Sequence, residues 1–258
     1  MLRAAILIAA TSYFEWYLEQ FEMAMVYPFD DTYATPGEAG EARLVEARFT
    51  TADGEELILW QSTAAETQPT LLYFPGNAGG LKDRADRFSA LIDRGYGVVA
   101  VAYRGSSGSS GAPGETEFTS DAREVAAALP MEPLVLYGES LGTGVAIKLA
   151  SEGIGDAVVL EAPFTSIADL VAVQFPRDDL KHLLTQQWDS AGSVAGLQQP
   201  LLIVHGRFDK IVPIEQGRAV FKAAGSTDKQ FLEVADRGHH NLWTVEMQRA
   251  LFEFLDLH

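Results

Sequence analysis

The sequence contains no cysteine, and this absence removes whole classes of chemistry. Disulfide bridges, zinc sites built on thiolates and cysteine nucleophiles are all excluded. Because a protein without thiols does not respond to the redox state of its surroundings, the cysteine count does not indicate a cellular compartment.

Positive charge is also scarce. The 258 residues carry 19 Lys and Arg against 36 Asp and Glu, which gives a formal net charge of −17 at pH 7. So acidic a surface repels phosphate backbones and anionic lipid headgroups, which argues against a nucleic-acid partner. With 47% hydrophobic residues, the chain is long and apolar enough to bury the core of one large globular domain.

The hydrophobic run near the N-terminus is short. Its eleven uncharged residues, 4–14, fall below the roughly 20 that a membrane-spanning helix needs, and Glu15 interrupts the run early. Apolar side chains then recur at helical spacing at Phe14, Leu18, Phe21 and Met25, with glutamates on another face. We expect residues 1–25 to form a helix packed on the domain or a membrane-associated segment. A cytoplasmic or membrane-associated location is therefore expected ahead of secretion.

Beyond residue 44, short apolar segments alternate with amphipathic ones. The apolar segments predict strands at 44–51, 57–61, 70–74, 97–102, 134–137, 157–160, 201–205 and 231–234. The amphipathic segments predict helices at 82–94, 118–129, 141–151, 213–224 and 242–257. Such alternation is typical of an α/β fold, a mostly parallel twisted sheet with helices on both faces. We assign this domain to residues 26–258.

A reactive serine is predicted where a strand meets a helix. The run Gly138-Glu139-Ser140-Leu141-Gly142 follows the strand 134–137 directly and opens the helix 141–151. This strand–turn–helix context is the one that a nucleophile elbow requires, with glycines where bulkier residues would clash. The turn also places the Ser140 hydroxyl at a helix N-terminus, which favours developing negative charge.

A serine needs a base, and the base needs a group to orient it. Asp209 and the pair His239-His240 follow two later strands, so the chain order is serine, acid, histidine. This order is that of α/β-hydrolases rather than of chymotrypsin-type or subtilisin-type enzymes. We predict Asp209 as the orienting acid and His239, which follows Gly238 directly, as the base, with His240 as the alternative. His205 is expected to be a packed or hydrogen-bonded histidine.

The glycine-rich loop Phe74-Pro75-Gly76-Asn77-Ala78-Gly79-Gly80 ends the first core strand. Its exposed backbone N–H groups predict an oxyanion donor at Asn77, with Ala78 as the near alternative, beside the N–H of Leu141. No Gly-Lys-Ser/Thr follows the loop, which argues against a nucleotide-phosphate site. The predicted chemistry needs no cofactor, and no metal-ligand cluster is found in the sequence.

Together these blocks resemble a known family. The chain is similar to the α/β-hydrolase-domain serine hydrolases without a large cap domain. The matching segments are VYP from Val26, FPGNAGG, YRGSSGSSG from Tyr103, LYGESLGTGVA, LEAPFTS, WDS, HGRFDKIVP and GHHN. That group includes protein depalmitoylases and serine aminopeptidase-like bacterial hydrolases, and its members are often anchored in membranes at the N-terminus. The family's nucleophile, acid and base carry over onto Ser140, Asp209 and His239. The chain departs from the family at Pro75, where relatives often have histidine, and in the doubled histidine of GHHN.

The resemblance implies hydrolysis of a carboxylic ester or thioester of a small-molecule or acylated substrate through an acyl-enzyme. An aminopeptidase or amidase on the same three residues is the alternative enzyme. It would need an acidic pocket for the amine, for which Glu139 or Glu161 are the candidates. A non-catalytic binding protein on the hydrolase fold is the alternative of another class.

Three further expectations concern residues around the site. We expect Arg104 to form a structural ion pair, with Glu115 as its nearby partner in sequence. The stretch 163–199, with short helical patterns around 167–173 and 179–186, is too short for a separate cap domain, so the site should be fairly open. Four large apolar residues of this stretch are expected either to belong to the core or to line an acyl groove. They are Phe164, Phe175, Leu183 and Trp188.

Overall fold

The computed structural model describes residue 13 and residues 16–130, 133–174 and 184–258. Within these residues one eight-stranded sheet has the order β1-β2-β4-β3-β5-β6-β7-β8. Strand β2 pairs antiparallel with β1 and β4, and all other pairs are parallel. The strands are β1 (Val45–Thr50), β2 (Glu56–Ser62), β3 (Thr70–Phe74), β4 (Gly97–Val101), β5 (Leu134–Glu139), β6 (Ala157–Glu161), β7 (Leu201–Gly206) and β8 (Lys229–Val234).

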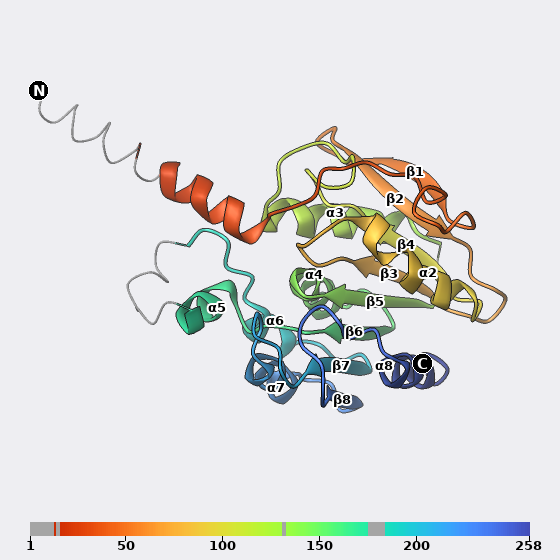
Figure 1. Ribbon diagram of the computed structural model, residues 1–258. Helices are drawn as coiled ribbons and strands as arrows, with labels where there is room; N and C mark the ends of the chain where they lie inside the picture. Colours follow the sequence, from red (N-terminus) through yellow and green to blue (C-terminus); the bar gives the residue numbers. More distant parts are fainter. Residues whose placement is uncertain (1–12, 14–15, 131–132, 175–183) are drawn as a thin grey trace, which may run out of the picture.

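Helices cover both faces of this sheet (Figure 1). They are η1 (Leu81–Arg84), α2 (Ala85–Ile92), α3 (Glu115–Ala128), α4 (Leu141–Ser151), α5 (Ile167–Gln174), α6 (Ser190–Val194), α7 (Ile214–Ala223) and α8 (Val245–Leu255). Helices α3, α4, α6 and α7 contribute to the hydrophobic cluster on one face, and η1, α2 and α8 to the cluster on the other.

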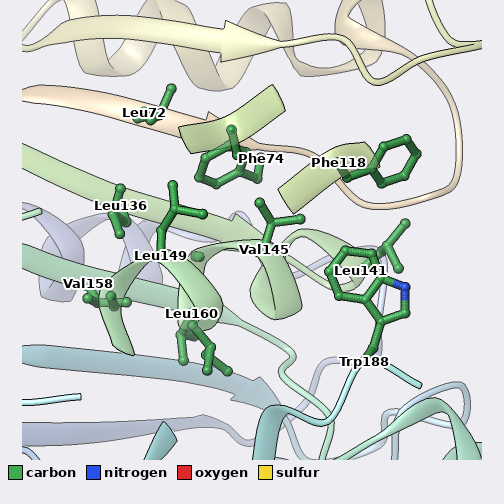
Figure 2. Packing of buried hydrophobic residues seen from close by; sticks show 14 of the residues in the cluster. Leu72, Phe74, Phe118, Leu136, Leu141, Val145, Leu149, Val158, Leu160 and Trp188 are labelled. Carbon is green, nitrogen blue, oxygen red and sulfur yellow. The ribbon is translucent and has the colours of Figure 1, made fainter. Parts of the chain in front are cut away.

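Each central strand serves both clusters because successive side chains point to opposite faces. In β3, Leu72 and Phe74 lie in one cluster, and Leu71 and Tyr73 lie in the other. Figure 2 shows the first cluster, in which the side chains of β3, β5 and β6 face those of α4. Every residue of β4, β6 and β7 is buried, as continuous apolar strands require. The predicted mostly parallel α/β fold is confirmed.

The sequence prediction was less accurate outside the central layers. The predicted helix 82–94 is divided into a 3₁₀ turn, η1, and α2, and the short helix α6 was not predicted. A helical pattern expected at 179–186 falls partly outside the described residues, and residues 184–186 are not helical. Two short helices, α5 and α6, lie in the described parts of the connection between β6 and β7.

The N-terminal helix runs through residues 16–26 and projects beyond the sheet layers (Figure 1). The predicted apolar face does not pack on the domain, since Phe21 is 58% exposed and Met25 is 46% exposed. Glu22 is buried instead. Phe14, the first residue of the predicted stripe, lies outside the described residues. In the described part of the chain, no helix has the length and apolar character needed to cross a membrane.

A buried acceptor network explains why Glu22 faces inward. Its carboxylate accepts hydrogen bonds from the backbone N–H of Thr185 at 2.9 Å and of Gln186 at 2.8 Å, and from the Thr185 hydroxyl at 2.8 Å. Tyr27, just after the helix, donates to the Gln186 side chain at 2.6 Å and accepts from the Trp188 indole at 2.9 Å. Polar contacts therefore set which face of this helix meets the domain.

Candidate active site

Ser140 occupies the sharp turn between β5 and α4. Its backbone has φ +49° and ψ −113°, a conformation that residues with a side chain rarely adopt. A Cβ atom on Gly142 would lie 2.0 Å from the carbonyl oxygen of Phe74, and one on Gly138 would lie 2.5 Å from the carbonyl oxygen of Gly142. The turn therefore requires glycine at both flanking positions. The Ser140 N–H donates to the Glu161 carbonyl at 2.8 Å, which ties the turn to β6.

The side chains of Ser140, His239 and Asp209 form a continuous hydrogen-bonded chain. Ser140 Oγ lies 2.9 Å from His239 Nε2, and His239 Nδ1 lies 2.6 Å from Asp209 Oδ2. A carboxylate only accepts hydrogen bonds, so Nδ1 carries the imidazole proton and Nε2 is free to accept from the serine hydroxyl. This arrangement lets the imidazole remove the serine proton.

Asp209 is held by several donors besides His239. Its Oδ1 atom accepts from the backbone N–H groups of Ile211 at 2.9 Å and Val212 at 2.8 Å. Burial by itself raises the pKa of Asp209, but the His205 ring, whose Nε2 lies 3.5 Å from Oδ2, and the hydrogen bonds from His239 and the Val212 N–H outweigh it and hold the pKa well below its usual range. The acid therefore stays ionised at neutral pH beside the imidazole.

The two other candidate histidines have different surroundings. His205 is fully buried, and its Nε2 donates to the Val212 carbonyl at 2.9 Å, as expected for a hydrogen-bonded histidine at a strand end. His240 is exposed, and its ring meets the His239 ring edge-on at 5.0 Å between centroids. Only His239 of the pair contacts both Ser140 and Asp209 among the described residues.

The glycine-rich loop after β3 lies directly beside Ser140. A Cβ atom on Gly76 would lie 3.3 Å from the Ser140 Cβ atom. The Asn77 side chain donates to the Val26 carbonyl at 2.8 Å, which ties the loop to the end of the N-terminal helix. The Asn77 backbone N–H has no hydrogen-bond partner among the described residues. Leu141 opens α4, so its N–H has no partner within the helix.

Two arginines, which sequence reasoning missed, pair with the acidic residues that end β5 and β6. Arg84 pairs with Glu139, the residue before Ser140, and Arg87 pairs with Glu161 at the end of β6. The sequence shows both arginines at helical spacing after the glycine-rich loop, but their partners depend on the order of the strands in the sheet. Neither carboxylate is thus left as an open acidic pocket.

Arg104 does form a structural ion pair, but the expected partner is wrong. Its guanidinium binds Asp121 on α3 at 2.6 Å and Asp53 in the turn between β1 and β2 at 2.7 Å. Glu115 instead accepts from the backbone N–H groups of Gln187 at 2.7 Å and Trp188 at 2.9 Å. Proximity in sequence was a poor guide because the sheet brings the β1–β2 turn close to α3.

The side chains proposed for an acyl groove are core residues where they are described. Phe164 and Trp188 are buried in the cluster that contains α4, and the Trp188 ring covers Gly144 of that helix. Phe175 and Leu183 lie outside the described residues. The groove interpretation is therefore wrong for Phe164 and Trp188.

Comparison with known proteins places these features in a family. Residues 65–191, which include Ser140 but end before Asp209, match the family model Hydrolase_4 (serine aminopeptidase, S33). Protein bem46 of Schizosaccharomyces pombe is 31% identical over 239 residues, covering 83% of this chain and 79% of bem46. The lysophosphatidylserine lipase ABHD12 of Rattus norvegicus is 31% identical over 238 residues, covering 79% of this chain and 60% of ABHD12.

A solved structure agrees with the fold. The Pyrococcus furiosus esterase Pf2001 superposes with a TM-score of 0.72 at 18% sequence identity, covering 90% of this chain and 98% of the esterase. At this identity the likeness speaks for the fold alone. The family-model match, together with relatives that are 31% identical over most of this chain, shows that this protein belongs to the α/β-hydrolase family and is a hydrolase.

Proposed function

We propose that this hydrolase cleaves carboxylic ester or thioester bonds through an acyl-enzyme formed on Ser140. The observation that carries the proposal is the hydrogen-bonded chain of Ser140, His239 and Asp209, with distances of 2.9 and 2.6 Å. A hydroxyl becomes nucleophilic when an oriented imidazole accepts its proton. A lysophosphatidylserine lipase among its relatives supports an ester as the substrate class.

In the first step Ser140 Oγ attacks the acyl carbon while His239 Nε2 takes the hydroxyl proton. The carbonyl oxygen becomes an oxyanion, which the N–H groups of Asn77 and Leu141 stabilise. A donor of this kind contributes roughly 10²–10³ in rate. The tetrahedral intermediate then collapses, the bond to the leaving alcohol or thiol breaks, and the imidazolium returns its proton to that leaving group.

In the second step water hydrolyses the acyl-enzyme. His239 Nε2 removes a proton from water, and the resulting oxygen attacks the acyl carbon. Collapse of the second intermediate releases the carboxylic acid and returns the proton to Ser140 Oγ. Asp209 keeps the imidazole in one orientation and stabilises its charged form in both steps.

An aminopeptidase on the same residues is the second enzyme candidate, favoured by the description of the matching family model. Such an enzyme must bind the protonated amine of its substrate. The acidic candidates for that role, Glu139 and Glu161, are paired with Arg84 and Arg87. Since each carboxylate is already neutralised, an ester or thioester fits the site better.

A substrate panel separates these activities. We expect wild-type protein to hydrolyse p-nitrophenyl esters or acyl thioesters of acyl groups ranging from acetyl to palmitoyl, and Ser140→Ala to lose this activity. Aminoacyl anilides should be poor substrates. Activity confined to the anilides would favour the aminopeptidase, and no Ser140-dependent activity on any substrate would favour the non-catalytic binding protein.

We also propose that the N-terminal helix contacts a membrane surface and that the protein is cytoplasmic or membrane-associated. Four large apolar or aromatic side chains on this helix are each between 46% and 58% exposed: Trp16, Tyr17, Phe21 and Met25. Tryptophan and tyrosine favour the interface between lipid and water. The net charge of −17 opposes anionic headgroups, so the contact would be apolar and interfacial.

Intrinsic tryptophan fluorescence with lipid vesicles tests this contact. Trp60 and Trp188 are buried and Trp243 is half-buried, so Trp16 is the tryptophan most open to lipid. Phosphatidylcholine vesicles should shift the emission of wild-type protein to shorter wavelength but leave Trp16→Phe unchanged. Binding that requires anionic lipid, or no binding at all, would contradict the proposal.

A further inference from the structure

Two carboxylates lie side by side next to the proposed active site and take no part in the steps above: Glu161 is buried, and the Glu139 side chain is 21% exposed. Glu139 and Glu161 are register partners at the carboxyl ends of β5 and β6. Each carboxylate accepts a hydrogen bond from a tyrosine on the neighbouring strand, Glu139 from Tyr73 of β3 and Glu161 from Tyr137 of β5. Arg84 and Arg87 supply the opposite charges.

Arg84 uses all three of its guanidinium nitrogens. Nε donates to Glu139 Oε2 at 3.0 Å and Nη2 to Glu139 Oε1 at 2.9 Å. Nη1 donates to the carbonyl oxygens of Ala78 at 2.7 Å and Gly80 at 3.0 Å. The side chain is only 8% exposed. One buried group therefore joins the residue before Ser140 to the loop that follows Asn77.

This link spans the two backbone segments that the proposed oxyanion site requires. Leu141 follows Ser140 on the elbow, and Asn77 lies one residue before the first carbonyl that Arg84 binds. Gly79, between the two carbonyls that Arg84 binds, has φ +70°, a backbone conformation that glycine adopts readily. A planar fork with several fixed donors can satisfy a carboxylate and two carbonyls together, whereas an ammonium group cannot.

We propose that Arg84 is a positioning residue that fixes the Asn77 N–H relative to Ser140 and offsets the negative charge of Glu139 beside the oxyanion. The inference rests on the proposed function and assigns a role within it. An uncompensated carboxylate next to Ser140 would oppose the charge that develops in the transition state. A displaced loop would lose the alignment of the donor, for which an error of about 1 Å can cost about 10²-fold in rate.

The test compares Arg84→Lys with Arg104→Lys. Arg104 is an equally buried arginine with two acidic partners, 7% exposed, and among the described residues its hydrogen bonds and ion pairs go to Asp53 and Asp121 and not to the glycine-rich loop. Both variants lose a buried fork, so any general loss of stability is matched. Rates are expressed per active site titrated with a fluorophosphonate, which removes unfolded protein from the comparison.

For Arg84→Lys we expect kcat to fall about 10–10²-fold with little change in KM. The affinity for a boronic acid, which imitates the tetrahedral intermediate, should fall in parallel with kcat/KM. Arg104→Lys should retain wild-type kcat and boronate affinity. In Arg84→Gly, added guanidinium should restore part of kcat, an effect that general destabilisation would not produce.

Two kinds of failure can be told apart. If wild-type protein resists the fluorophosphonate, or Ser140→Ala remains active, the proposed function itself is wrong. If those controls behave as proposed but Arg84→Lys matches Arg104→Lys in kcat and boronate affinity, the role of Arg84 alone is overturned. Should Arg84→Lys yield too little folded protein, Arg84→Gly with and without guanidinium at reduced temperature gives the same decision.

Discussion

At the scale of single residues, the turn around Ser140 depends on contacts too close for any side chain. Ser140 has a positive φ, and the surrounding backbone must hold it there. The close approach of Gly142 to the Phe74 carbonyl joins this turn to the strand that carries the glycine-rich loop. The same contact thus serves both the fold and the site.

Replacing Gly142 by alanine tests this contact. We expect Gly142→Ala to lower the free energy of unfolding by about 3 kcal/mol, because the new methyl group overlaps the Phe74 carbonyl. Gly37→Ala is the matched control, since no atom lies within 4 Å of its new methyl group. Urea unfolding measures both, and equal stability of the two variants would contradict the packing described.

Glu139 provides a second residue-scale prediction, on pH dependence. Burial raises the pKa of Glu139, but the charges of Arg84 and Arg87 outweigh it and lower the pKa from 4.5 to about 2. The folded protein therefore binds this proton less readily than the unfolded chain does. Ionised Glu139 stabilises the fold above about pH 4.5, and this contribution is lost as the pH falls towards about 2.

The stability difference between wild-type protein and Glu139→Gln should therefore be largest near about pH 6 and shrink towards about pH 3. Urea unfolding across this range provides the measurement. Glu253→Gln, at a 71% exposed position on α8, should show no comparable trend. A difference for Glu139→Gln that stays constant or grows on acidification would show that the sign is wrong.

At the scale of helices and strands, local pattern predicted the sheet well and the N-terminal helix poorly. The apolar strands β3, β6 and β7 and the helix α4 lie within one residue of their predicted bounds, because continuous burial leaves a clear signal. Periodicity predicted a helix near the N-terminus but could not say which face meets the domain. That choice depends on Glu22 finding the backbone of residues 185–186, which lie far away in sequence.

In the site, too, local pattern predicted some residues, and contacts between distant segments were missed. The types and chain order of Ser140, Asp209 and His239 suggested a hydrolase site, since few other uses require that series. The Arg84 and Arg87 pairs went unseen because they join η1 and α2 to the ends of β5 and β6, a contact that only the sheet order creates. The partner of Arg104 was missed for the same reason.

An element-scale prediction concerns Glu22. In Glu22→Ala the backbone N–H groups of Thr185 and Gln186 lose their acceptor, so their hydrogen exchange should speed up. Glu19→Ala, at an exposed position on the same helix, is the control. Hydrogen–deuterium exchange with mass spectrometry reads out both variants. Unchanged protection of residues 184–188 in Glu22→Ala would argue that Glu22 does not hold this segment.

At the scale of the whole molecule, a parallel sheet brings the ends of distant segments to one edge. Ser140 follows β5, Asp209 follows β7 and His239 follows β8, so the three side chains meet at the carboxyl ends of strands far apart in sequence. The glycine-rich loop after β3 joins them there. Helices on both faces bury the strands that carry these loops.

Labelling with a fluorophosphonate, followed by mass spectrometry of the whole protein and its peptides, tests the proposed role of Ser140 as the nucleophile. We expect one adduct per wild-type chain, located on Ser140, no adduct in Ser140→Ala, and much slower labelling in His239→Ala. An unlabelled wild-type protein that is folded, or labelling of Ser140→Ala at the wild-type rate, would contradict this role.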